Sequence, residues 1–484
     1  MKKKTMMMVG LLIFSGVSFA AAEAREDAEL YEWKNGDGMN GVFPHITVMA
    51  PGAGSDSEAG VGAMIPWADR LWVIGYVAHI RGENLGLFEL KEDMSWRRHP
   101  ASVTGTFANR FIHWESKQAI IGPHLIDEKG KVRTIEQLSK HRLTATCYHL
   151  EKPQAMVYFL TMEGLLFEVN VNTLEVKQLG DLTKKLYVEG IWPHWKGMWS
   201  AQGKLVVANN SYGEGEHMGK RHAGRLAEWD GEGEWKILEK NPFVEVSGQT
   251  RRGKYGGALF ATGWDERSVI MRVLSNGKWK RYRLPKGNHT YDHGWNTEWM
   301  RIREAQTERY LMDVFGIFYE MPAIVYDNSV WGVKPICSHL RLIPDFCSWR
   351  GFFVMGSDQT EHNVGQPQSG LYFGNIDDLW QMGKPTGWGA VWRKTEIEAG
   401  ETSDPFLMTG FDKKVLHLAV ESEDPMTITV EVDFLGDGMW KEYETFNLEP
   451  GGYVHHEFPD AFSAHWVRLK TDGDCKATAQ FMYN

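Results

Sequence analysis

The sequence predicts an all-β protein, a seven-bladed β-propeller followed by a small C-terminal antiparallel β-sandwich. The chain of 484 residues holds 51 glycines, and 12% of its residues are aromatic, a composition typical of tight turns and half-buried strands. A unit of strand, turn and strand recurs between residues 69 and 374. Beyond it, roughly the last 85 residues alternate strictly between apolar and polar side chains, which is typical of a small sandwich.

The N-terminus carries the pattern of a secretory signal peptide. Three lysines, Lys2 to Lys4, precede an apolar stretch from Met6 to Phe14, and small residues follow up to Ala20. We therefore predict that residues 1–20 are a signal peptide, cleaved on export. The apolar stretch is short for a membrane span, so we expect no membrane anchor. The mature protein should be periplasmic or extracellular.

The repeated unit is an apolar strand, a turn and a second strand, and its commonest element is a Gly-Leu-aromatic-Glu tag. Copies begin roughly 40–60 residues apart, the spacing of four-stranded propeller blades with uneven loops. An array of sandwiches would place strands at the same density, but the recurrence of the tag favours a propeller over residues 21–400. The copies, about seven in number, lie at 69–90, 118–127, 156–169, 204–229, 268–284, 310–321 and 351–374.

The C-terminal region, residues 401–484, is predicted to be a separate sandwich. Its strands alternate without interruption, as in 427–434, and turns such as 436–438 are short. A stretch rich in glycine and tryptophan, residues 382–403, is the expected connection. Such a module can bind sugars or simply pack against the propeller.

The charge of the chain limits its partners. The formal net charge is −10, which disfavours binding of nucleic acid. We expect a glycan partner instead. An acidic glycan would have to be held by locally placed arginine, lysine or histidine, because the mean field of the protein would repel it. The sequence does not define the oligomeric state.

Four cysteines are too few for a disulfide framework in a chain of this length, and we expect buried free thiols. Cys337, His339 and Cys347 carry ligand types that suit zinc, so a structural metal stays open, although their spacing matches no established zinc pattern. The chemistry predicted below requires no metal or other cofactor.

Candidate site residues occur in loops that a propeller would bring together over its central channel. His113 and His124 bracket one predicted strand, and histidine is a natural general base near neutral pH. If a turn lies between them, both can face one funnel. A structural role, with each histidine hydrogen-bonded beside Trp114 or Pro123, is an equal alternative.

A second group of candidates surrounds a long, glycine-rich polar stretch, residues 211–224. Tyr212 can donate a proton, and Arg225 can neutralise a carboxylate through its planar fork. His194 and Asn210 are expected to bind substrate beside them. Alternatively, the stretch is a solvated connection and Arg225 forms an ion pair between blades.

The third and densest group contains His293, Trp295, Glu298 and Arg301, and a weaker patch contains Gln359. Aromatic platforms beside carboxylates, amides and arginines suit a sugar ring, whose C–H faces stack while its hydroxyls need polar partners. We expect these residues to bind substrate. Arg301 could equally tie neighbouring blades together by ion pairs.

The paired histidines, the loop of Tyr212 and Arg225 and the sevenfold repeat together resemble the seven-bladed propeller enzymes that act on carbohydrates in gut and marine bacteria. These include the ulvan lyases and related enzymes that cleave rhamnosyl-glucuronate. The resemblance implies that His113 or His124 is the base, that Tyr212 is the acid and that Arg225 neutralises the uronate carboxylate. The reaction implied is β-elimination in a polysaccharide or oligosaccharide.

Two other functions use the same scaffold. A glycoside hydrolase would need two suitably separated carboxylates, for which the candidates are Glu298, Glu304, Asp292 and Asp358. A glycan-binding propeller without catalytic activity would need only the aromatic funnel.

Overall fold

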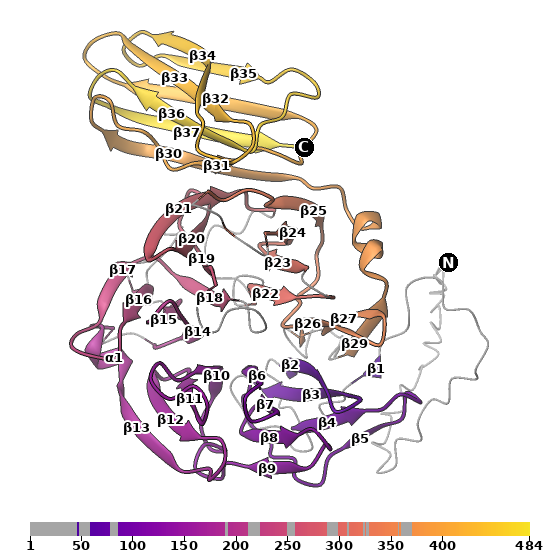
Figure 1. Cartoon of the computed structure of the whole chain (residues 1–484). Helices are drawn as coiled ribbons and strands as arrows, with labels where there is room; N and C mark the ends of the chain where they lie inside the picture. Colours follow the sequence, from indigo (N-terminus) through magenta and orange to yellow (C-terminus); the bar gives the residue numbers. More distant parts are fainter. Residues whose placement is uncertain are drawn as a thin grey trace, which may run out of the picture.

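Small antiparallel sheets follow one another around a central axis, and a separate pair of sheets lies beside this ring (Figure 1). The description comes from a computed structural model. It covers residues 46–47, 59–77, 86–188, 192–211, 223–248, 257–287, 299–306, 309–322, 325, 329–356, 358–359 and 370–484. The described residues form an all-β, propeller-like protein.

The sheets of the ring are meanders in which consecutive strands pair, apart from the pairings of β1 and β28 that close the ring. The first three sheets contain β2 (Ala59–Trp67), β3 (Arg70–Val77), β4 (Leu87–Leu90) and β5 (Trp96–Arg98); β6 (Arg110–His113), β7 (Gln118–Ile121), β8 (His124–Asp127) and β9 (Val132–Thr134); and β10 (Leu143–Tyr148), β11 (Met156–Thr161), β12 (Leu165–Asn170) and β13 (Val176–Asp181). A short helix, α1 (Leu182–Lys185), follows β13.

The next sheets continue the pattern around the ring. They contain β14 (Trp195–Ala201), β15 (Lys204–Asn209), β16 (Arg225–Trp229) and β17 (Lys236–Glu239); β18 (Phe243–Gly248), β19 (Leu259–Trp264), β20 (Val269–Ser275) and β21 (Lys278–Leu284); and β22 (Arg301–Glu304), β23 (Tyr310–Val314), β24 (Ile317–Met321) and β25 (Lys334–Ser338).

The two ends of the ring are joined by strand pairing. The last sheet consists of β26 (Phe346–Trp349), β27 (Phe352–Gly356), β29 (Gly370–Gly374) and β1 (Ile46–Thr47), so a segment from the start of the chain completes it. In addition, β28 (Asp358–Gln359), which follows β27, pairs with β2 of the first sheet. A β-strand with an unpaired edge is a site of aggregation, and these pairings cover two edges where the ring closes.

The first strand of each sheet lies closest to the axis, and neighbouring first strands contact each other around the centre (Figure 1). In most sheets the repeated unit predicted from sequence corresponds to the second and third strands, for example β3 and β4. At 268–284 it corresponds to the third and fourth strands, β20 and β21. The innermost strands therefore lie outside the repeated unit.

The C-terminal region is a sandwich of two antiparallel sheets around its own apolar core. It begins with β30, which pairs with β37, and thus before residue 401, the predicted start. The first sheet contains β30 (Gly387–Ile397), β37 (Cys475–Tyr483), β32 (Lys414–Glu421) and β35 (Tyr453–Glu457). The second contains β31 (Phe406–Leu407), β36 (Trp466–Thr471), β33 (Met426–Asp433) and β34 (Lys441–Leu448).

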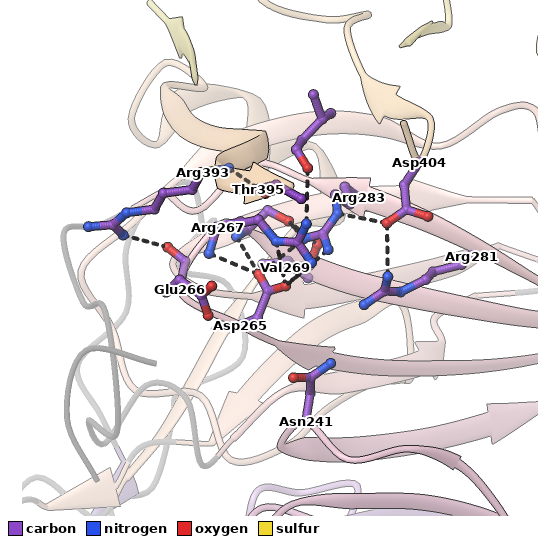
Figure 2. Close-up of polar contacts among 12 residues, drawn as sticks. Asn241, Asp265, Glu266, Arg267, Val269, Arg281, Arg283, Arg393, Thr395 and Asp404 are labelled. Atoms are coloured by element: carbon purple, nitrogen blue, oxygen red, sulfur yellow. Dashed lines mark hydrogen bonds and ion pairs between the residues drawn. The ribbon is translucent and has the colours of Figure 1, made fainter. Parts of the chain in front are cut away.

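The sandwich is joined to the ring by shared backbone pairing and by a buried polar cluster. Strand β21 pairs in parallel with β31, so one sheet runs from the ring into the sandwich. Across this junction Arg283, which is fully buried, contacts Asp265 at 3.0 Å and Asp404 at 2.8 Å (Figure 2). Arg267 contacts Asp265 at 3.0 Å, and Arg281 contacts Asp404 at 3.0 Å. We call these five residues the junction cluster.

None of the helices in the described part of the chain is both long and apolar enough to cross a membrane.

Candidate functional site

A cavity of about 670 Å³ occupies the centre of the ring. It is lined by the innermost strands, including β10, β14, β18 and β22. Strand β14 approaches β18 closely at Gly197, where a Cβ atom would lie 2.5 Å from the Val244 carbonyl oxygen. Only glycine fits such an approach. The volume lies within the usual range for sites that hold small molecules, roughly 300–1,000 Å³.

The cavity reaches the surface at the hairpin turns that follow innermost strands. Its lining includes residues 67–70 after β2, Trp114 after β6 and Arg350 after β26. Asp69 and Arg350 are exposed there. Trp67 and Trp114 contact each other edge to face with ring centroids 5.9 Å apart. One end of the cavity therefore has an aromatic and charged rim.

Two buried aromatic residues lie near the opposite end of the innermost strands. Trp299, just before β22, contacts Tyr76 at the end of β3, with ring centroids 4.9 Å apart. The cations of Lys196 and Arg301 lie 5.9 and 5.0 Å from the Trp299 ring. Both cations line the cavity. Trp299 thus supports two positive charges in the cavity wall through its π face.

The cavity wall is rich in positive charge although the protein as a whole is acidic, with a net charge of −10. Its acidic lining residues are Asp69, Glu245 and Glu304. The basic ones are twice as many: Arg70, Arg110, Lys196, Arg301, Arg303 and Arg350. Four of the basic residues pair with carboxylates just outside this lining: Arg70 with Glu89, Arg110 and Arg303 with Asp345, and Arg350 with Glu92. The local excess of positive charge is therefore smaller than the count of lining residues suggests.

Arginines and carboxylates from several innermost strands form one connected group, which we call the cavity cluster. Asp345 accepts a hydrogen bond from Arg303 Nε at 2.7 Å and forms an ion pair with Arg110, whose Nε lies 3.1 Å away. Glu245 accepts from Arg303 Nη1 at 2.6 Å and lies 3.6 Å from Arg301 Nη1. The cluster holds three arginines and two carboxylates.

Two nitrogens of this cluster, Nη2 of Arg301 and Nη2 of Arg303, donate no hydrogen bond to a described residue. Arg301 donates from Nε to the Pro344 carbonyl and from Nη1 to the Met300 carbonyl, and Arg303 donates only from Nε and Nη1. Among the described residues, Nη2 of each arginine has no hydrogen-bond partner. Both residues line the cavity, so these two donors are hydrogen-bonding capacity at the cavity wall that no described residue uses.

The two arginines differ electrostatically. Burial lowers the pKa of Arg301 to about 10, although Glu245 opposes this shift. Burial acts in the same direction on Arg303, but Glu245 and Asp345 together raise its pKa above the ordinary value. The carboxylates of the protein therefore stabilise the charge of Arg301 less than that of Arg303, and a bound anion would stabilise it further.

The structure places the predicted histidines His113 and His124 away from the cavity. Both are fully buried and neither lines it. His113 contacts Ser116 Oγ through Nδ1 at 2.8 Å and the Pro153 carbonyl through Nε2 at 2.7 Å. His124 contacts Thr134 Oγ1, and burial lowers its pKa to about 3. This geometry favours the structural alternative over the role of general base.

Arg225, predicted to neutralise a substrate carboxylate, contacts backbone carbonyls instead. Its Nε, Nη1 and Nη2 donate to the carbonyls of Leu186, Gly224 and Tyr187 at 2.9, 2.7 and 2.9 Å. The side chain is buried and does not line the cavity. In this arrangement Arg225 fixes a turn.

His194 and Asn210 are brought together as expected, but outside the cavity lining. The Asn210 amide donates to the His194 carbonyl at 3.0 Å, and the His194 amide donates to Ser211 Oγ at 2.9 Å. The side-chain amide of Asn210 is buried and has no hydrogen-bond partner among the residues that the structure describes.

The remaining predictions have unequal outcomes. Arg301 lines the cavity, and Gln359 is placed only by its backbone, which pairs with Ala59 of the innermost strand β2. Outside the described residues lie Tyr212, His293, Trp295 and Glu298.

All four cysteines are free and buried, as expected. Burial raises the pKa of both Cys337 and Cys347 to about 12. His339 contacts Asp313 at 2.9 Å. Within the described ranges, no group of three or more histidine, cysteine, aspartate or glutamate side chains is arranged to hold a metal ion.

The sequence interpretation missed Glu245 and Asp345 as members of the site and gave no role to Arg110 or Lys196. All lie on or beside innermost strands, where charged residues interrupt the apolar pattern. A signal that could have found them is a charged residue within the apolar strand that comes just before each repeated unit.

Three solved structures are similar to this chain at low sequence identity. U3-55K has a TM-score of 0.40 and 10% identity over 65% of this chain and 94% of that one. The extracellular domain of a one-component system from B. thetaiotaomicron has a TM-score of 0.41 and 8% identity over 90% of this chain and 58% of that one. A chain of the mitotic checkpoint complex has a TM-score of 0.39 and 8% identity over 76% of this chain and 100% of that one. Neither a protein-family model nor a curated protein matches the chain.

Proposed function

We propose that this protein is an exported, seven-bladed propeller that binds a uronate-containing saccharide in its central cavity. The observation that carries the proposal is the pair of Nη2 donors of Arg301 and Arg303, which line the cavity and have no partner among the described residues. Two guanidinium groups with free N–H donors suit a carboxylate, whose oxygens accept charge-assisted hydrogen bonds.

The aromatic rim supports a sugar as the ligand that carries this carboxylate. Trp67, Trp114 and Trp349 belong to the lining, and aromatic faces stack against the C–H faces of sugar rings. A cavity of about 670 Å³ is large enough for a short saccharide rather than for a folded protein segment. We therefore infer that the charged end of the saccharide enters beside the tryptophans and meets the arginines.

Cleavage of the saccharide by β-elimination is a second candidate. It rests on the resemblance to propeller lyases, and its acid, Tyr212, lies outside the described residues. The described lining contains no histidine. Glu245 is held by arginines, so a pair of hydrolytic carboxylates is not supported there. Binding is consequently the activity that the described residues support best.

Calorimetric titration with a galacturonate disaccharide and with its carboxyl-reduced, neutral counterpart tests the proposal. We expect binding of the acidic sugar only, and a loss of affinity of about thirtyfold in Arg301→Gln, the worth of one or two charged hydrogen bonds. Arg309→Gln is the matched control, because Arg309 is half exposed and pairs with Glu320 outside the cavity.

Equal affinity for both sugars, or an unchanged affinity in Arg301→Gln, would falsify the proposal. The same samples decide the second candidate: new absorbance at the unsaturated-uronate band indicates a lyase, and new reducing ends without it indicate a hydrolase.

A further inference from the structure

Exposed apolar side chains gather on one turn of the sandwich and on the ring segment against which it packs. The turn between β33 and β34 carries Phe434, Leu435 and Met439, which are 53, 66 and 65% exposed. Trp331, on the connection from β24 to β25, is 48% exposed. The described part of the chain has ten exposed large hydrophobic side chains in all, so four of the ten belong to these two short segments.

The turn touches the ring segment at Gly436. A Cβ atom there would lie 3.0 Å from Trp331 Cβ and 2.7 Å from the Val330 carbonyl oxygen, so glycine allows the close approach. Ser329 Oγ also donates to the Asp437 carbonyl at 3.2 Å. The three exposed residues of the turn lie within three positions of Gly436, and therefore within about 11 Å of it. We call the four exposed residues the boundary patch: Trp331, Phe434, Leu435 and Met439.

A buried carboxylate holds the turn in shape. Asp433 is 2% exposed and accepts from the backbone amides of Gly436 at 2.8 Å and of Gly438 at 2.7 Å. It also accepts from the amides of Leu435 and Asp437, both at 3.3 Å. The apolar side chains are thus presented on a preformed backbone, and a partner has little ordering left to impose on the turn.

The size of the boundary patch suits one side of a protein interface. At these exposed fractions each side chain leaves on the order of 100 Å² in water, and the four together leave about 400 Å². A standard interface covers roughly 800 Å² on each partner, of which about 65% is apolar in homodimers. The patch therefore supplies most of the apolar part of such an interface.

Charged residues beside the patch favour a protein partner over a lipid surface. Asp437 is exposed in the middle of the turn, and Lys441 is exposed at the start of β34. Insertion into lipid would remove the Asp437 carboxylate from water, which is costly. Two copies related by a twofold axis bring each patch onto the other, and Asp437 of one copy can then meet Lys441 of the other on both sides of the axis.

We propose that the boundary patch is the interface of a twofold symmetric dimer of this chain. A second copy fits this surface because the patch carries both signs of charge beside its apolar side chains and so complements itself. The inference does not depend on the proposed function, since the described lining of the cavity includes none of the four patch residues.

Sedimentation velocity of the full chain at about 1 and 50 µM tests the dimer. We expect the wild type to be dimeric at the higher concentration. Leu435→Glu should weaken the dimer at least about a hundredfold, because it places an unpaired carboxylate of each copy in the apolar contact. Leu435→Met keeps the contact apolar and should dimerise normally. The matched control is Leu340→Glu, since Leu340 is 100% exposed and lies beyond the other end of β25 from Trp331.

A wild-type chain that is monomeric at the higher concentration overturns the inference, as does a dimer that persists in Leu435→Glu. Cosedimentation with phosphatidylcholine vesicles covers the lipid alternative. If a monomeric wild type bound the vesicles and Leu435→Glu did not, the patch would bind lipid instead of a second copy. Leu435 is 66% exposed, so the variant should fold, and equal urea midpoints of variant and wild type at the lower concentration verify this.

Discussion

The junction cluster and the cavity cluster contain the same kinds of residues, but Arg283 at the junction uses its donors more completely than Arg301 and Arg303 do in the cavity cluster. Each has three arginines and two carboxylates. At the junction, all three nitrogens of Arg283 donate, to Asp265, Ser268 and Asp404, and the side chain is fully buried (Figure 2). In the cavity cluster, Nη2 of Arg301 and of Arg303 donates to no described residue, and both side chains line the cavity.

Charge count therefore does not distinguish a structural cluster from a binding site. Burial alone would lower the pKa of Arg283, but Asp265 and Asp404 raise it overall, whereas burial lowers the pKa of Arg301 to about 10. The difference lies in the geometry of the carboxylates around each guanidinium group. A donor that faces a cavity without a partner is the feature that indicates a ligand.

The largest effect is expected at the junction. Arg283→Met leaves the buried carboxylate of Asp265 with less compensation, and we expect the free energy of unfolding to fall by about 3–5 kcal/mol. Urea denaturation followed by tryptophan fluorescence measures it. The folded variant should bind the disaccharide with unchanged affinity. A loss of stability below about 1 kcal/mol, comparable to surface substitutions, would contradict the claim that the junction cluster stabilises the fold.

The reverse pattern is expected in the cavity cluster. Arg301→Gln should weaken the disaccharide complex by about 2 kcal/mol, which corresponds to roughly thirtyfold. Its free energy of unfolding should fall by less than that of Arg283→Met, because Arg301 lies 3.6 Å from its nearest carboxylate, Glu245. Calorimetry and urea denaturation of both variants give the two quantities. If Arg301→Gln lost stability as Arg283→Met does and kept its affinity, the two clusters would have the same role.

A smaller effect should appear on raising the pH. A guanidinium group is charged below its pKa, so the affinity for the disaccharide should stay constant near neutral pH and fall as the pH rises through about 10, where Arg301 loses its proton. A bound carboxylate favours the charged form and raises the pKa of Arg301 in the complex, so the affinity falls from the pKa of the free protein up to the higher pKa of the complex. The charge of Arg283 at the junction should not change in this pH range, because its pKa is raised. Titrations at constant ionic strength measure the affinity, and a flat profile to pH 10.5 would contradict the role of Arg301.

The sequence was sufficient for the all-β class, because glycine, aromatic residues and the recurring tag reflect local strand and turn preferences. It also indicated a C-terminal sandwich, since strict alternation in stretches such as 427–434 matches strands with one buried face. The predicted start of the sandwich was too late because β30 lies within the Gly- and Trp-rich stretch, residues 382–403, which was interpreted as a connection.

The site was less accessible to sequence reasoning. His113, His124 and Arg225 are polar residues at strand ends, and nothing in their sequence context shows that Pro153, Thr134 or a turn of the neighbouring sheet satisfies them. The cavity cluster depends on contacts between residues far apart in the chain, such as Arg110 with Asp345. Such pairs appear only once the ring has closed.

A crystal structure of the chain with bound galacturonate disaccharide tests the role of the cavity most directly. We expect the sugar beside the rim tryptophans, with its carboxylate oxygens about 2.8 Å from Nη2 of Arg301 and of Arg303. A disaccharide bound without contact to either arginine, or bound only on another face of the ring, would contradict the assignment.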